Sequence, residues 1–281
     1  ALNKRYHTPN MERLAADGMK FTQAYACALC SPTRVSAITG MNAARHRVTN
    51  WTLRKNKSPD PASPRLTLPP WNVNGVCTNA GIERSMQVTT LPELLRAGGY
   101  RTIHAGKAHF GAVGTPGENP LNLGFDVNIA GCAIGGPGSY WGEKNFSAAW
   151  RTKPPEHIWD VPGLEAYHGK DINVMEAITL EAIKNVEKAV EEKKPFYLYM
   201  AQYGVHAPYE HDKRFYQKYI DAGMKPFEAM RLSMLEGMDK SLGDLMDMVK
   251  RLGIEENTII LFMSDNGVPQ EFPRNLPLRG H

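Results

Sequence analysis

The sequence has little of what marks a specialised class of protein. It contains 4 cysteines in 281 residues, too few for a disulfide-rich scaffold of this length, and they do not identify the redox compartment. No apolar run approaches the roughly 18 residues of a transmembrane helix, so we expect no membrane span. The net charge is only +4 and no dense basic cluster accompanies it, which argues against a nucleic-acid partner. The 25 glycines and 20 prolines follow no period, which excludes a collagen-like chain.

The rest of the composition is that of an ordinary globular protein. Hydrophobic residues make up 42% of the chain and charged residues 22%, which excludes intrinsic disorder as the default state. The length is compatible with one large domain or two small ones and is ample for a sizeable core. The first ten residues contain no apolar core of a signal peptide.

Helical and strand-like segments alternate along the chain. Apolar spacing, caps and breakers predict helices that open at Thr8-Pro9, at Ser31 and at Thr90. Longer helices are predicted over 171–193 and roughly 226–251, and short apolar runs predict strands at 21–26, 101–105, 196–203 and 258–264. This order is typical of an α/β fold with a mostly parallel central sheet and helices on both faces.

Residues able to do chemistry follow the predicted strands. In open parallel sheets, ligands bind beyond the carboxyl ends of the strands, so these residues should gather at one edge. The residues concerned are Cys30 and Arg34, Lys107 and His109, His206, and Asp265 and Asn266.

Each of these residues also has a plain structural interpretation. A cysteine at a helix N-terminus faces unpaired N–H groups that favour an anion, and Arg34 has a geometry suited to oxyanions. Cys30 could equally be a buried structural thiol beside a surface arginine. Asp265-Asn266 could form an ordinary turn, Lys107 could be a solvated lysine, and His206 could be a packed loop histidine.

Four motifs in a fixed order favour the functional interpretation. The run C-S-P-T-R at 30–34 resembles the signature of the type I sulfatases, and TPNMERLAADGMKFTQAYA at 8–26 is similar to the stretch that precedes it in that family. G-K-A-H at 106–109, H-A-P-Y at 206–209 and S-D-N-G at 264–267 match in family order. The resemblance covers nearly the whole chain.

The resemblance implies an alkaline-phosphatase-like fold and hydrolysis of sulfate monoesters, with carbohydrate esters as the expected class. In the family, a maturation enzyme converts the signature cysteine to formylglycine, and its hydrated gem-diol attacks sulfur beside a divalent metal. The second hydroxyl then expels sulfate and restores the aldehyde. Calcium is the implied metal, with magnesium as the alternative.

The resemblance also assigns roles to individual catalytic residues. Cys30 is the precursor of the nucleophile, and Arg34 holds the modified side chain. Lys107 and His206 contact sulfate oxygens and stabilise developing charge. His109 lies near the diol as a candidate base or orienting group.

A second group of residues is implied for the metal and its surroundings. Asp265 and Asn266 supply oxygen ligands, together with Cys30 as formylglycine. His46 and Arg279 are expected to lie near the site in supporting positions.

The chain departs from the family at both ends. Family members begin with a strand that ends in Asp-Asp and supplies two metal ligands, and no such segment precedes Ala1. A lysine after L-R-G and a smaller C-terminal subdomain are also missing after His281. We therefore expect residues 1–281 to form a partial sulfatase catalytic domain with an incomplete metal site and little activity alone. The resemblance implies a periplasmic or otherwise exported enzyme.

Two other functions remain open on the sequence. One is hydrolysis of phosphate or phosphonate esters by the same fold, although a cysteine in the signature favours sulfate. The other is a non-catalytic binding domain without formylglycine. The substrate itself would be selected by loops such as 50–88 and 111–168. Trp141, Tyr209, His211 and the 131–141 loop could shape the substrate pocket.

Overall fold

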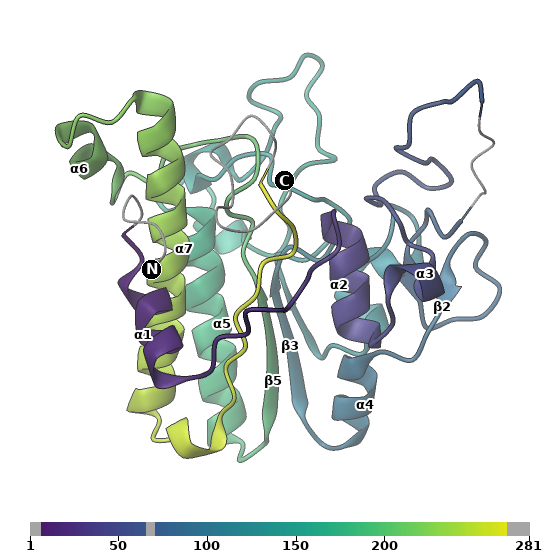
Figure 1. Cartoon of the computed structure of the whole chain (residues 1–281), viewed down its shortest axis with the longest axis horizontal. Helices are drawn as coiled ribbons and strands as arrows, with labels where there is room; N and C mark the ends of the chain where they lie inside the picture. Colours follow the sequence, from purple (N-terminus) through teal and green to yellow (C-terminus); the bar gives the residue numbers. More distant parts are fainter. Residues whose placement is uncertain (1–6, 66–70, 269–281) are drawn as a thin grey trace.

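The centre of the protein is a three-stranded parallel sheet (Figure 1). The computed structural model describes residues 7–65 and 71–268. Strand β3 (Arg101–Gly106) lies in the middle, between β4 (Val127–Ile129) and β5 (Phe196–Ala201). Within the described residues, the outer edge of β5 pairs with no strand.

Successive residues of the strands face two different cores, as the two-residue period of a strand requires. Tyr197 and Tyr199 of β5 pack into a core with Val35 and Ile38. Leu198, which lies between them, packs into a second core on the opposite face. A parallel sheet buried on both faces explains why β5 is an uninterrupted apolar and aromatic run.

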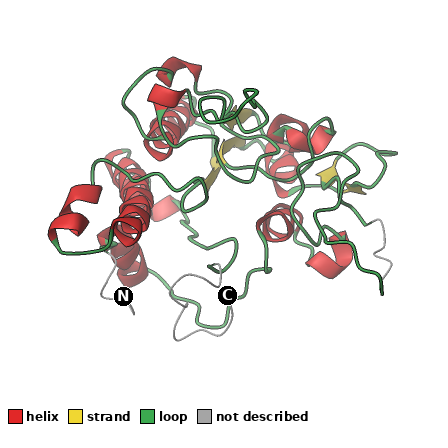
Figure 2. Ribbon diagram, turned by 90° about the horizontal axis from the view of Figure 1, so that it is seen from above, coloured by secondary structure: helices red, strands yellow, loops and turns green. Residues whose placement is uncertain are grey.

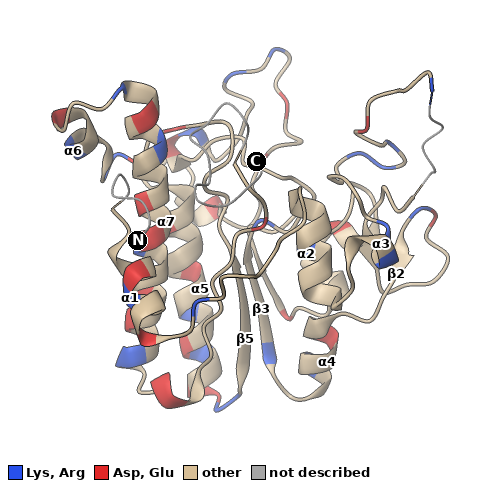
Figure 3. Cartoon of the chain, viewed as in Figure 1, with Lys and Arg blue, Asp and Glu red and all other residues tan. Residues whose placement is uncertain are grey.

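Helices cover both faces of this sheet (Figures 1 and 2). On one face lies α5 (Val174–Glu191), backed by the long α7 (Pro226–Arg251), against which α1 (Pro9–Asp17) packs. On the other face lie α2 (Cys30–Thr39) and α4 (Leu91–Ala97). Figure 3 shows acidic and basic residues mainly on the helices and loops, whereas β3 and β5 are almost free of them.

Shorter elements fill the connections. β1 (Val76–Cys77) and β2 (Met86–Gln87) form a separate two-stranded parallel sheet. The others are α3 (Ala43–His46), α6 (Tyr216–Asp221) and the 3₁₀ turns η1 (Pro116–Glu118), η2 (Pro120–Leu123), η3 (Gly142–Lys144), η4 (Glu165–Tyr167) and η5 (Glu255–Asn257). None of the helices in the described ranges combines the length and apolar character that a membrane crossing requires.

The predicted α/β class and most of its elements are confirmed, but two predicted strands are wrong. Residues 258–264 and 21–26 are extended and unpaired. Ile259 and Leu261 are 87% and 83% exposed, and Tyr25 is 87% exposed. Their apolar side chains have the composition of buried strands, but no strand among residues 7–65 and 71–268 pairs with them. The short β4 was not predicted, because three residues are too few to show a period.

Candidate active site

The candidate residues gather at the carboxyl end of the sheet, as predicted. Cys30 is the first residue of α2 and is 7% exposed. Lys107 follows β3 directly, His206 lies five residues after the end of β5, and Asp265 lies in the segment after α7. The carboxyl ends of β3 and β5 are at the top of the sheet in Figure 1. Leu29, not the predicted Ser31, is the N-cap of α2, and Ser31 lies 3.4 Å from the hydroxyl of Thr52.

Arg34 forms the centre of a buried charge cluster. Its Nε and Nη2 each lie 2.8 Å from Oδ2 of Asp265, and its Nη1 donates to the carbonyl of Lys107 at 2.6 Å. The Lys107 ammonium lies 3.6 Å from the same Asp265 oxygen. One carboxylate therefore holds two cations at the N-terminal end of α2.

The backbone at the end of β3 is what places Lys107 in this cluster. Gly106 has φ of +103°, and a Cβ there would overlap the carbonyl of Ala201 in the neighbouring strand. That same carbonyl accepts the Lys107 N–H at 2.7 Å. Glycine permits both the positive φ and the close approach of the two strands.

The charges in the cluster shift one another. Burial, followed by repulsion from Arg34, lowers the pKa of Lys107, although Cys30 and Asp265 oppose this. Burial alone would raise the pKa of Asp265, but Arg34 and Lys107 together bring it below its ordinary value. The carboxylate is therefore ionised. A bound anion near the Lys107 ammonium would offset its repulsion from Arg34 and favour its charged form.

Two histidines stand beside this cluster. His109 is 3% exposed, and its Nδ1 has no hydrogen-bond partner in the described part of the chain. Burial, then repulsion from Lys107, lowers the pKa of both His109 and His206. Both imidazoles are thus held neutral near pH 7, with a nitrogen able to accept a proton.

Two glycines of the 131–141 loop make room for these rings. A Cβ on Gly135 would come within 2.7 Å of the His109 ring, and a Cβ on Gly136 would overlap Nδ1 of His206. Glycine at these two positions therefore allows the loop to approach the two histidine rings closely.

Tyr140 is a residue that the sequence analysis missed. It is fully buried, and its hydroxyl lies 2.8 Å from the carbonyl of Tyr203 and 2.9 Å from that of His206. It also accepts the N–H of His206 at 3.1 Å. Tyr140 therefore fixes the loop that carries His206, a role that only the folded chain reveals.

The remaining predicted residues lie elsewhere or outside the description. His46 is buried but bonds to Ser36 Oγ at 3.0 Å and accepts the N–H of Val48, so it joins α2 to α3. The Asn266 amide donates to the carbonyl of Gly267. Arg279 lies outside the described residues.

The described residues do not make a complete cation site. Asp265 and Asn266 offer oxygen atoms of the kind calcium prefers, but Oδ2 of Asp265 is held by Arg34 and Lys107. Over residues 7–65 and 71–268, no group of three His, Cys, Asp or Glu side chains could hold a metal. A hard divalent cation takes six or more oxygen ligands, so further donors are required.

Without a metal, the arrangement is that of an anion site. The N-terminus of α2, Arg34 and Lys107 together present N–H donors and positive charge beside the Cys30 thiol. Neutral imidazoles of His109 and His206 are available for proton transfer. The cations and N–H donors could bind the negative charge of a tetrahedral oxyanion ester. The imidazoles could exchange a proton with its leaving group.

Comparison with known proteins agrees with this geometry. The Sulfatase family model matches residues 2–280. The chain is 30% identical over 273 residues to N-acetylgalactosamine-6-sulfatase of Mus musculus, covering 92% of this chain and 45% of that protein. It is 26% identical over 285 residues to arylsulfatase J of Mus musculus, covering 97% and 41%. It thus spans about half the length of these relatives.

Solved structures give the same fold. The crystal structure of Ps i-CgsB superposes with a TM-score of 0.72 at 25% identity, over 94% of this chain and 54% of that one. The PsFucS1 sulfatase from Pseudoalteromonas sp. superposes with a TM-score of 0.62 at 23% identity, over 93% and 50%. With the family model matched over nearly its whole length, this chain belongs to the sulfatase family.

Proposed function

We propose that the chain is the main part of a catalytic domain that hydrolyses sulfate monoesters of carbohydrates. The observation that carries the proposal is the buried cluster of Cys30, Arg34, Lys107 and Asp265 at the N-terminus of α2. The names of relatives support the substrate class, since one acts on N-acetylgalactosamine 6-sulfate by name and Ps i-CgsB was crystallised with a neocarrahexaose.

The residues divide the work as follows. Cys30, converted to formylglycine by a maturation enzyme, provides the nucleophile, and Arg34 orients it. Lys107 and His206 bind sulfate oxygens and stabilise the charge that develops on them. His109, neutral and buried, takes or returns a proton at the nucleophile, and Tyr140 keeps His206 in position.

We also propose that the site is completed by chain segments beyond these residues. Asp265 and Asn266 would provide only part of the ligand set for calcium, or for magnesium in its place. A strand beside the free edge of β5, ending in acidic residues, would add further oxygen ligands at the same end of the sheet. A C-terminal subdomain would enlarge the protein to the length of its relatives. Export from the cytoplasm fits the same proposal.

A paired hydrolysis assay tests the reaction. An aryl sulfate and the matching aryl phosphate are given to protein produced with a formylglycine-generating maturation enzyme, in a chain extended at both ends. We expect hydrolysis of the sulfate, and its loss in Cys30→Ala. Preferred turnover of the phosphate would favour the related phosphate ester hydrolases and contradict the proposal.

Mass spectrometry of the peptide containing Cys30 tests the modification independently of turnover. Conversion replaces the thiol by an aldehyde and lowers the peptide mass by a defined amount. An unmodified thiol in protein from its native host would indicate a binding domain that keeps the fold without the chemistry.

A further inference from the structure

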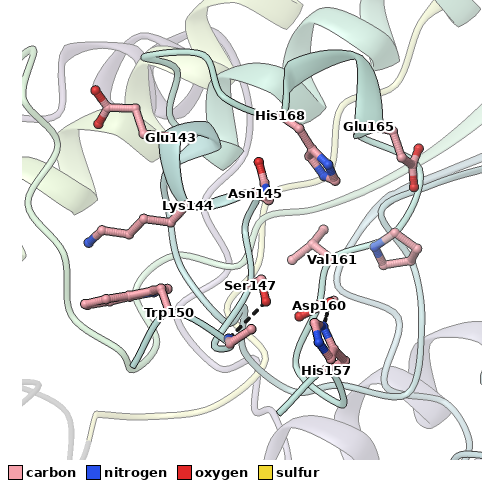
Figure 4. A pocket seen from close by; sticks show the side chains of 12 residues that line it. Glu143, Lys144, Asn145, Ser147, Trp150, His157, Asp160, Val161, Glu165 and His168 are labelled. Atoms are coloured by element: carbon pink, nitrogen blue, oxygen red, sulfur yellow. Dashed lines mark hydrogen bonds and ion pairs between the residues drawn. The ribbon is translucent and has the colours of Figure 1, made fainter. Parts of the chain in front are cut away.

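A separate pocket lies in the loops between β4 and α5 (Figure 4). Its volume is about 530 Å³, within the range of sites that hold small molecules. It is lined by one aromatic side chain, Trp150, and by a ring of polar side chains that includes Asn145, Ser147 and His168. None of the residues placed in the active site lines it.

An ion pair and a hydrogen bond link the wall of the pocket to the loop that carries His206. Lys144, on its wall, forms an ion pair of 2.7 Å with Glu210, four residues after His206. The other oxygen of Glu210 accepts the N–H of Tyr140 at 2.6 Å. Figure 1 shows these teal loops above the upper ends of β3 and β5, where Lys107 and His206 follow. Glu210 and Tyr140 thus join the wall of the pocket to the loop that carries His206.

The polar lining does not favour an anion. The cationic Lys144 is already paired with Glu210, and the His157 ring lies 2.8 Å from Asp160. Glu165 is a further carboxylate in the lining, with no excess of positive charge around it. A sulfated ring would meet these carboxylates at close range, whereas a neutral ligand would not.

The pocket instead offers the two features that bind a neutral sugar. Trp150 is 54% exposed. The Lys144 ammonium lies 4.0 Å from the centroid of its indole ring and covers one face, so the C–H face of a pyranose would have to pack on the other face. The side-chain amide of Asn145 donates no hydrogen bond within the described residues. One oxygen of the Glu165 carboxylate accepts the N–H of Gly163 at 2.9 Å, which leaves the other oxygen as an acceptor, so the lining holds both a donor and an acceptor.

We propose that this pocket is a subsite for an unsulfated sugar unit of an oligosaccharide whose sulfated unit occupies the active site. Its place in catalysis rests on the proposed sulfatase function, but the binding itself does not. With this subsite we expect a preference for oligosaccharides over single sulfated sugars. Trp150 would be its specificity-determining residue.

Calorimetric titration of the chain with an unsulfated galactose tetrasaccharide tests the proposal. We expect saturable binding that Trp150→Ala weakens by about tenfold or more, since the indole face is lost. Trp150→Phe, which keeps an aromatic face, should retain most of the affinity. The matched control is Trp51→Ala, because Trp51 is 50% exposed and lines a different groove of about 170 Å³.

The outcomes separate this proposal from the proposed function. Added inorganic sulfate, which would occupy the anion site, should leave the sugar affinity unchanged. Absence of saturable binding, equal affinity in Trp150→Ala, or an equal loss in Trp51→Ala would overturn the subsite. Hydrolysis of an aryl sulfate with no Trp150-dependent sugar binding refutes the subsite alone. Sugar binding without any sulfate hydrolysis refutes the proposed function alone.

Discussion

The geometry of single residues accounts for most of the proposed chemistry. Asp265 is the one carboxylate in contact with both Arg34 and Lys107, and its side chain is only 26% exposed. Removing one member of a buried ion cluster leaves the others without compensation, which costs more than the pair itself contributes. The cluster therefore serves stability as well as anion binding.

Asp265→Asn should lower the free energy of unfolding of this chain by about 2 kcal/mol, because Arg34 and Lys107 would then repel one another at short range. Chemical denaturation at pH 7 measures it. The control is Asp247→Asn, since Asp247 is 65% exposed in its pair with Arg13, and such surface pairs contribute at most about 1 kcal/mol. Equal losses in the two variants would contradict a special role for the buried cluster.

Gly136→Ala should displace the ring of His206, because the added Cβ would overlap Nδ1 of that ring. In an active form of the protein we expect kcat/KM to fall by about 10- to 100-fold, as small misplacements of catalytic groups do. The imidazole resonances of His206 in an NMR spectrum should shift in parallel. Gly98→Ala, at the end of α4 and just before the amino end of β3, lies at the opposite end of the sheet from the site and should change neither quantity.

At the level of elements, the sequence predicted those whose signals are local. α4 begins at Thr90 with a capping box that Glu93 completes, and both residues were legible in the sequence. α7 has the predicted bounds because Pro226 at its first position marks its start. The strand predicted over 258–264 was wrong because a strand forms only where a neighbouring strand pairs with it, whatever its own residues favour.

For the site too, the sequence predicted what local signals determine and missed what depends on contacts in the folded chain. The positions of Cys30, Lys107 and Asp265 after predicted strands indicated that they would meet at one edge of the sheet, although the strand predicted before Asp265 is not formed. The sequence did not distinguish His46, which forms a hydrogen bond between α3 and α2, from the residues that face the charge cluster. The sequence also missed Tyr140, whose hydroxyl donates a hydrogen bond to the carbonyl of Tyr203, 63 residues away along the chain.

The burial of His104 in β3 makes the central sheet sensitive to acid. Burial, then repulsion from Arg34, lowers the pKa of His104 to about 3. The unfolded chain binds a proton there below about pH 6.5, while the folded chain does not, so stability falls as the pH drops from 6.5 towards 3. His104 stacks on Tyr199 with 5.6 Å between ring centroids, so it is fixed in this environment.

His104→Leu should remove its share of this pH dependence, about 1.4 kcal/mol per pH unit over that interval. The measurement is the free energy of unfolding at pH 7 and pH 5 in both proteins. His168→Leu, at an exposed histidine, should leave the difference between the two pH values as it is in the original chain. An unchanged difference in His104→Leu would show that the ring is protonated in the folded state.

On the scale of the whole molecule, helices cover both faces of the sheet, but its two edge strands, β4 and β5, have no outer partner within the described residues. β5 has no partner on its outer side within the described residues, and the apolar residues 258–264 run unpaired and exposed after α7. Unpaired edges and exposed apolar runs favour association with another strand. We proposed above that a strand outside this chain fills that place.

The double variant Ile259→Lys and Leu261→Lys tests this proposal. Both side chains are more than four-fifths exposed, at 87% and 83%, so in this chain the variant should change the melting temperature little and should reduce binding of apolar dyes. In a protein extended at its N-terminus by the proposed strand, the same substitutions would bury two lysines, and we expect a loss of several kcal/mol. If the extended protein tolerates the double variant as well as this chain does, residues 258–264 remain at the surface and the missing strand does not lie beside β5.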